Sequence, residues 1–332
     1  MHRILLLALL LTTVPLVGCI GADGDELTEN AADTAQRVAD QAIPGNAAVL
    51  HRAGGERAPL DVAGMLGEGI PLPSGTLRSS GEAAFEPTLG VTSDGTIFLS
   101  SFDRGDPGDY VAVRRSTDDG LTWEDVTPSL AGASSYPPTS NDPYVYVDED
   151  TDRVFISDLQ ALMCSTLAFS DDGGESWTPN PIGCGQPFGV HDHQTVFSAH
   201  PRTLETVGYE KVVYYCINRV ADSACATSLD GGMTFGPLRP VVFPGVDPGL
   251  TTDAQGFCGG LHAHGAAAPD GTVYLPKGHC GIPMVAISQN DGVTWDIVTI
   301  SEDVPAGGHE VAFATDEAGN AYAFWISDDD LP

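Results

Sequence analysis

The sequence contains few basic residues. Lysine and arginine together number 14 among 332 residues, against 46 aspartates and glutamates, and the formal net charge is −32. Lys211 and Lys277 are the only lysines. A chain this acidic repels nucleic acids and anionic membrane surfaces, so neither is an expected partner. The acidity is typical of solubility in a salty habitat, where ions screen crowded carboxylates. Calcium binding is the alternative, but no acidic run has the spacing of a calcium-binding loop.

The sequence also lacks the Cys-x-x-Cys spacing that is typical of structural zinc sites. It has seven cysteines, and setting Cys19 aside leaves six, an even number that favours disulfide bonds in an exported chain. Cys216 and Cys225 flank an expected hairpin. Six cysteines can pair in many ways, and the topologically simplest set is Cys216–Cys225, Cys164–Cys184 and Cys258–Cys280.

A long apolar run occurs at the N-terminus, over residues 1–18. It is too short to span a membrane in the mature protein and is typical of a secretory signal peptide. The end of this run, Leu16 to Cys19, resembles a bacterial or archaeal lipobox, which implies lipidation of Cys19. We therefore expect residues 19–46 to be a lipid-anchored acidic tether on the outer side of a cell membrane. An ordinary signal peptide with a chance cysteine is the alternative.

One eight-residue pattern occurs four times, beginning at Ser116, Ser170, Ser228 and Ser288, which lie 54, 58 and 60 positions apart. Asp or Asn in the third position bonds to the turn backbone, and Gly in the fifth adopts a positive φ. The serine adds a local hydrogen bond, and the final aromatic residue packs between sheets. The residues with these roles are Ser116, Asp118, Gly120, Trp123, Ser170, Asp172, Gly174, Trp177, Ser228, Asp230, Gly232, Phe235, Ser288, Asn290, Gly292 and Trp295.

These copies resemble the Asp-box (bacterial neuraminidase, BNR) repeat of the sialidase superfamily and of sortilin-type receptors. The resemblance implies an all-β fold, a β-propeller of four-stranded antiparallel blades, over residues 86–332. In the proteins it resembles, each repeat lies between the third and fourth strands, on the face opposite the functional one. We expect four complete blades and a partial fifth. Sialidase-type rings have six blades, so a truncated ring is the first expectation; strands in the approach segment, residues 47–85, that close the last blade are the alternative.

Polar residues stand just before the expected innermost strand of each blade. These strands are predicted at residues 88–91, 144–147, 195–198, 265–268 and 311–314, where small or β-branched residues suit a crowded axis. Because the preceding residues are equivalent in successive blades, we expect them to converge at one mouth of the central channel. Residues two apart on a strand also point to the same side. The polar residues are Glu86, Asp142, His191, Asp192, His193, His262, His264, His309 and Glu310.

This mouth has three interpretations. Four imidazoles, from His191, His193, His262 and His264, could bind a divalent transition metal. A polar ligand pocket without metal would use the ligand-binding residues Glu86, Asp142, Asp192, His309 and Glu310. Polar side chains that merely line a wet channel are the third interpretation. His279, in a loop beside Cys280, is expected to be exposed.

The first blade departs from the sialidase pattern. The family carries an arginine at the start of its first innermost strand, and this chain has Glu86 there. That arginine helps to bind a substrate carboxylate, which Glu86 would repel, so true sialidase activity is not expected. Asp106 or Asp109 lies in the loop where the family's aspartate acid/base is found, although aspartate beside glycine is commonly a turn residue.

Three functions remain. The first is a cell-surface propeller that binds a glycan or another polar ligand at its axial mouth. The second is a sialidase-superfamily exo-glycosidase or a metal-assisted lyase that uses Asp106 or Asp109 with the histidines as acid/base groups. The third is a sortilin-like scaffold for an extracellular protein partner.

Overall fold

The computed structural model describes residues 47–50, 58–61, 87–105, 108–128, 142–160, 164–180, 182, 191–219, 222–244, 260–306 and 311–326. The chain divides into two compact units, Met1–Leu77 and Arg78–Pro332. In the first unit, β1 (Ala47–Leu50) pairs with β2 (Ala58–Asp61) in an antiparallel sheet. No helix long and apolar enough to cross a membrane occurs among these residues. The predicted signal peptide, tether and lipidated Cys19 lie outside them.

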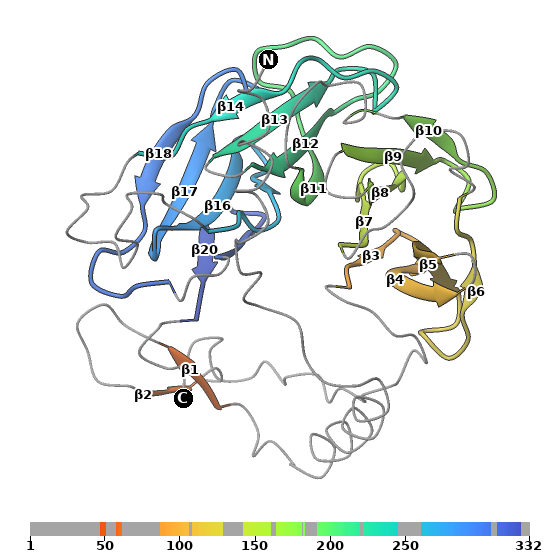
Figure 1. Ribbon diagram of the computed structural model, residues 1–332, viewed down its shortest axis with the longest axis horizontal. Coiled ribbons are helices and arrows are strands. Elements are labelled where there is room, and N and C mark those ends of the chain that lie inside the picture. The colour runs from red at the N-terminus through yellow and green to blue at the C-terminus, as the bar shows by residue number, and fades with distance from the viewer. Residues whose placement is uncertain are drawn as a thin grey trace, which may run out of the picture. The chain divides into compact units, whose positions relative to one another are not determined.

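The second unit contains four antiparallel sheets of four strands, and two strands of a fifth sheet are described (Figure 1). The first sheet is β3 (Leu89–Val91), β4 (Ile97–Gly105), β5 (Gly108–Ser116) and β6 (Glu124–Asp125). The second is β7 (Tyr144–Val147), β8 (Val154–Gln160), β9 (Cys164–Ser170) and β10 (Thr178–Asn180). The third is β11 (Asp192–Ala199), β12 (Val212–Asn218), β13 (Ser223–Ser228) and β14 (Arg239–Val241). The fourth is β15 (Ala266–Ala267), β16 (Val273–His279), β17 (Ile282–Ser288) and β18 (Asp296–Thr299), and the fifth pair is β19 (Ala312–Thr315) and β20 (Ala321–Phe324).

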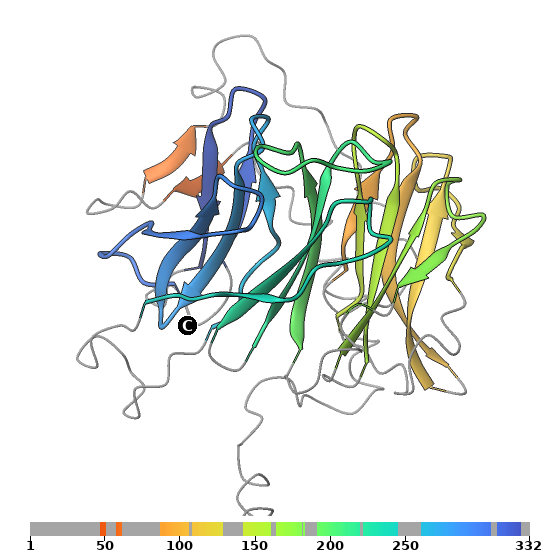
Figure 2. The ribbon, with the colours of Figure 1, turned by 90° about the horizontal axis from the view of Figure 1, so that it is seen from above.

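The first strands of successive sheets lie next to one another. Contacts join β3 to β7, β7 to β11, β11 to β15 and β15 to β19. Within each complete sheet the strands follow in chain order from this inner edge outwards. Figures 1 and 2 show the four sheets following one another in an arc, face against face. The second unit is therefore the predicted β-propeller, with four complete blades and two strands of a fifth among the described residues.

Each gap between neighbouring complete sheets holds its own apolar core. One core joins the first two sheets through residues such as Phe98 and Ile156, and another joins the second and third through Phe155 and Tyr215. The core between the third and fourth sheets includes Tyr214. Every residue of β12 is buried because sheets cover both of its faces. Such strands are therefore continuous apolar runs without alternation.

The four repeats form four equivalent turns between the third and fourth strands, which we call the repeat turns. In each turn the serine hydroxyl accepts a hydrogen bond from the glycine N–H, at 2.8 to 2.9 Å. The Asp or Asn side chain accepts one from the backbone four residues later, at 2.8 to 2.9 Å. The glycines have φ between 74° and 95°. The local roles predicted from the sequence are confirmed.

Arginines of one blade bind the repeat turn of the next blade, which the sequence did not reveal. Arg115 Nη1 donates to the carbonyl of Gly173, and Arg153 Nη1 donates to that of Gly231, both at 2.6 Å. Arg202 Nε donates to the Gln289 carbonyl at 3.1 Å. These hydrogen bonds tie successive sheets together on the side of the repeat turns.

The predicted Cys216–Cys225 disulfide is present, and the two residues lie directly opposite each other on β12 and β13. Cys164 and Cys280 are also disulfide-bonded. Their predicted partners, Cys184 and Cys258, lie outside the described residues.

Candidate functional site

Five of the predicted site residues come together where the inner strands of three blades begin. Asp142 precedes β7, Asp192 and His193 begin β11, and His262 and His264 precede β15. We call these five residues the His/Asp mouth. The repeat turns lie at the opposite end of the sheets, because they follow the third strand, which runs parallel to the first.

A β-bulge positions His193. The pairing of β11 with β12 shifts register between Asp192 and Thr195, and His193 has a φ of 49°. A left-handed conformation is uncommon for a residue with a side chain, and bulges of this kind redirect side chains near functional sites. His193 Nδ1 donates to the carbonyl of His262 at 2.6 Å, which ties the third blade to the fourth.

The bulge overturns one expectation. A regular strand would direct His191 and His193 to the same side, but His191 precedes β11 and its Nδ1 lies 3.4 Å from the Tyr215 hydroxyl. His262 is buried whereas His264 is exposed, so this pair does not share one side either. The alternation rule fails because none of these positions belongs to an uninterrupted strand.

Three imidazoles nevertheless form a cluster. The rings of His193 and His264 stack with centroids 5.9 Å apart, and the ring of His262 lies 6.0 Å from that of His193 in an edge-on arrangement. Burial is the main cause that lowers the pKa of His262 to about 3, and the electrostatic effect of the neighbouring His193 ring adds to it. His262 is therefore neutral at pH 7, and its Nδ1–H donates to the Ala263 carbonyl at 2.9 Å.

Two carboxyl groups adjoin the imidazoles. Burial raises the pKa of Asp192, and the charge of Asp142 and a hydrogen bond between the two side chains raise it further, while His193 opposes the change. A hydrogen bond between carboxyl groups requires one of them to be protonated. Asp192 therefore retains a proton more readily than an isolated aspartate does.

The four histidines predicted as metal ligands do not converge on one point. His191 is buried beside Tyr215, apart from the three-ring cluster, and burial and the charge of Arg219 lower its pKa to about 4. Within the part of the chain that the structure describes, no three His, Cys, Asp or Glu side chains are placed to hold a metal ion.

Other predicted site residues fall elsewhere. Glu86, Asp106, His309 and Glu310 lie outside the described residues. Asp109, expected in a loop, lies in β5 opposite Arg104 of β4, because the hairpin continues to Gly105 and Gly108. His279, expected to be exposed, is buried at the end of β16.

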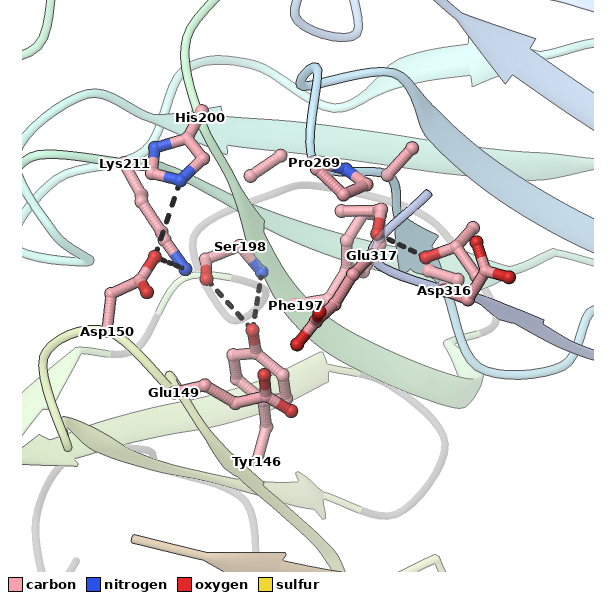
Figure 3. Close-up of a pocket in the computed structure, with 16 residues that line it drawn as sticks. Tyr146, Glu149, Asp150, Phe197, Ser198, His200, Lys211, Pro269, Asp316 and Glu317 are labelled. Carbon is pink, nitrogen blue, oxygen red and sulfur yellow. Dashed lines mark hydrogen bonds and ion pairs between the residues drawn. The ribbon is translucent and has the colours of Figure 1, made fainter. Parts of the chain in front are cut away.

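A pocket of about 470 Å³ lies at the other end of the inner strands, on the side of the repeat turns (Figure 3). Lys211 at its wall forms ion pairs with Asp148 and Asp150, at 3.0 and 2.6 Å. The buried Asp148 also accepts hydrogen bonds from the hydroxyls of Ser198 and Tyr209. This lysine is therefore neutralised within the protein.

No protein-family model matches the sequence, and no curated protein matches it significantly. Similar solved structures include the α-L-arabinofuranosidase Arb93A of Fusarium graminearum, 13% identical over 73% of this chain and 74% of that one, with a TM-score of 0.44. The leech intramolecular trans-sialidase is 14% identical over 79% and 61%, with a TM-score of 0.46. The NanB sialidase of Streptococcus pneumoniae is 11% identical over 79% and 62%, with a TM-score of 0.43. Identities this low, with TM-scores below 0.5, assign neither a family nor an activity to the chain.

Proposed function

We propose that this protein binds a polar, hydroxyl-rich ligand of the glycan class at the His/Asp mouth. The supporting observation is the convergence of two carboxyl groups and three imidazoles from three blades around the bulge at His193. Carboxylates accept hydrogen bonds from hydroxyl groups, and neutral imidazoles both donate and accept them. The proposed Asp-box character of the repeat turns adds support, because that resemblance puts the ligand face at the opposite end of the blades.

The site is proposed to act outside the cell, on a protein held by a lipid at Cys19. The disulfide between Cys216 and Cys225 supports export, because such bonds persist in oxidising compartments. The anchor rests on the sequence from Leu16 to Cys19 alone.

A glycan array followed by calorimetric titration of the best ligand tests the binding function. We expect saturable binding, and His264→Ala should weaken it about tenfold, which corresponds to about 1.4 kcal/mol. His264 is exposed, so its loss should not unfold the protein. His200→Ala is the matched control, because His200 is an exposed histidine at the opposite end of β11. The proposal would be rejected if the array gave no signal, or if His200→Ala weakened ligand binding as much as His264→Ala does.

Acid/base catalysis on such a ligand is the second candidate. It is favoured by the carboxyl pair, which can hold a proton beside the His193 imidazole, which can accept one. A carboxyl group that retains a proton beside an imidazole suits proton transfer in an elimination as well as in glycoside hydrolysis.

Two assays separate these reactions. Elimination yields unsaturated products from acidic polysaccharides, which ultraviolet absorbance detects, whereas hydrolysis releases the fluorophore from fluorogenic glycosides. An enzyme should lose about 100-fold or more of its rate in Asp192→Asn. Saturable binding with no turnover of either substrate class would leave the binding function alone.

A further inference from the structure

Three buried basic side chains share one face of the fourth blade beside the His/Asp mouth. His262 and Lys277 are opposite residues of an antiparallel β-bridge, so their side chains project on the same side. His279 lies two residues beyond Lys277 on β16 and shares that side. Phe243, which follows β14, covers them from the third blade, with its ring centroid 5.3 Å from Lys277 Nζ and 5.4 Å from the His279 ring. We call these three residues the basic cluster.

The polar groups of the basic cluster are buried but incompletely bonded. Lys277, His262 and His279 are 1%, 0% and 3% exposed. The Lys277 ammonium carries three N–H groups, and it donates one hydrogen bond, to Asn218 Oδ1 at 3.1 Å. In the described ranges, no carboxylate lies within ion-pair distance of Lys277, and neither His262 Nε2 nor His279 Nδ1 has a hydrogen-bond partner. Unpaired polar atoms at such depth are rare and call for an explanation.

Lys211, the other lysine of the chain, forms ion pairs and provides a comparison for Lys277. Lys211 contacts two carboxylates, and hydrogen bonds and charge from them raise its pKa despite burial. Burial instead lowers the pKa of Lys277 to about 8, so this lysine still carries its charge at pH 7. A buried charge without a counter-ion is costly. The charge of Asp222 partly opposes the lowering of the Lys277 pKa, but among the described residues no carboxylate forms an ion pair with Lys277. In a chain with 46 acidic residues, such a lysine marks a position where an anion from outside would be stabilised.

The basic cluster is continuous with the His/Asp mouth through His262, whose ring also lies 6.0 Å from that of His193. We propose that the Lys277 ammonium, flanked by His262 and His279, forms an oxyanion subsite that takes a carboxylate or sulfate group of the ligand. This inference rests on the proposed glycan-binding function and specifies that the ligand is acidic. The ammonium supplies the charge and the N–H donors for this group. The unpartnered nitrogens of the two neutral imidazoles are acceptors, because the other nitrogen of each ring donates to a backbone carbonyl, so they would accept hydrogen bonds from ligand hydroxyls beside the anionic group.

Thermal unfolding and calorimetric titration of the purified full-length protein with sodium glucuronate, sodium sulfate and glucose test the subsite. Sodium chloride at equal ionic strength corrects for screening of the acidic surface. Glucuronate, sulfate or both should raise the Tm above the chloride reference, and Lys277→Met should weaken their binding at least tenfold. Arg239→Gln is the matched control, since it removes one positive charge from an exposed position on β14. It should bind as the unaltered protein does.

Loss of binding in Lys277→Met is separable from unfolding, because replacing a buried charge without a counter-ion by an apolar side chain should not lower the Tm. A response to glucuronate alone supports a carboxylate, and a response to sulfate alone supports a sulfate ester. No response above chloride, or equal binding by Lys277→Met, overturns the subsite even where neutral glycans bind the array. Anion binding that depends on Lys277, in a protein that binds no glycan, overturns the glycan function and leaves the subsite standing.

Discussion

His191 shows how burial sets the charge of a single residue in this propeller. The residue is 1% exposed, and burial is the main cause that lowers its pKa to about 4 from an ordinary value of 6.5. Between these values the unfolded chain binds a proton at this position and the folded chain does not. Stability should therefore rise with pH through this window and fall on acidification below pH 6.5.

His191→Phe should remove this share of the pH dependence. The full contribution is about 3 kcal/mol over the window, an order-of-magnitude figure that follows from the pKa shift. Urea unfolding at pH 4, 5, 6 and 7 measures it, and the variant should show a flatter curve than the unaltered protein. Equal slopes in both proteins would mean that His191 is accessible to protons in the folded state.

The pKa of Lys277 predicts that stability also depends on pH in the alkaline range. Its folded pKa of about 8 lies below the ordinary 10.5, so between these values the unfolded chain holds a proton that the folded chain has lost. Stability should rise with pH across this range, by up to about 3 kcal/mol. In Lys277→Met the rise should be absent when unfolding free energies at pH 7.5 to 10 are compared. A rise of the same size in the variant would assign the effect to other groups.

At the scale of elements, the repeat turns require glycine for two separable reasons. Gly232 has a φ of 95°, and an added Cβ would lie 3.1 Å from the Phe155 ring in the neighbouring blade. Gly208 lies in the loop between β11 and β12, outside the repeat turns, and serves as the comparison. It has a φ of 71° and nothing within 4 Å of the added atom. Gly208→Ala should therefore cost about 1 kcal/mol from backbone strain alone. Gly232→Ala should cost about 2–3 kcal/mol because the clash adds to the strain.

Chemical unfolding of the two alanine variants side by side decides this prediction. Similar losses in both would show that the gap between the second and third blades can widen to accept a methyl group.

The aromatic residue of the second repeat connects two blades. Trp177 packs on the core between the first and second sheets, and its Nε1 donates to the Val126 carbonyl at 2.8 Å. The ring is only half-buried, so Trp177→Ala should cost about 2–3 kcal/mol, below the roughly 3–5 kcal/mol of a fully buried large aromatic residue. Trp177→Phe keeps part of the packing and should cost less. A change in Tm below one degree for Trp177→Ala would contradict this role.

At the scale of the whole propeller, stability depends on contacts that pass from blade to blade. Arg153 pairs with Asp171 in its own blade, stacks on the Phe169 ring at 4.1 Å and donates to Gly231 of the next blade. Arg153→Gln should cost about 2 kcal/mol, because the charged hydrogen bond to the next repeat turn is lost. Arg239→Gln, at an exposed position, should change the free energy of unfolding by less than about 0.5 kcal/mol. Equal effects would assign the loss to net charge.

Local order could be read from the sequence alone. The serine, the aspartate or asparagine, and the glycine of each repeat bond to one another within eight residues, so their pattern predicts the turn without knowledge of the rest of the chain. The regular spacing of the turns then predicted successive four-stranded blades. The polar residues Asp142, Asp192, His193, His262 and His264 were also recognised in advance, because they hold equivalent positions before the inner strands.

Contacts between distant residues had to await the folded chain. The bulge that turns His193 away from His191 arises from the pairing of β11 with β12 and has no signature in the residues themselves. Lys277 looks like an ordinary strand residue until the β-bridge sets it against His262. Burial between blades then removes it from water, and no carboxylate of the described residues forms an ion pair with it. Such effects come from packing across sheets, whereas the sequence pattern reports only neighbours along the chain.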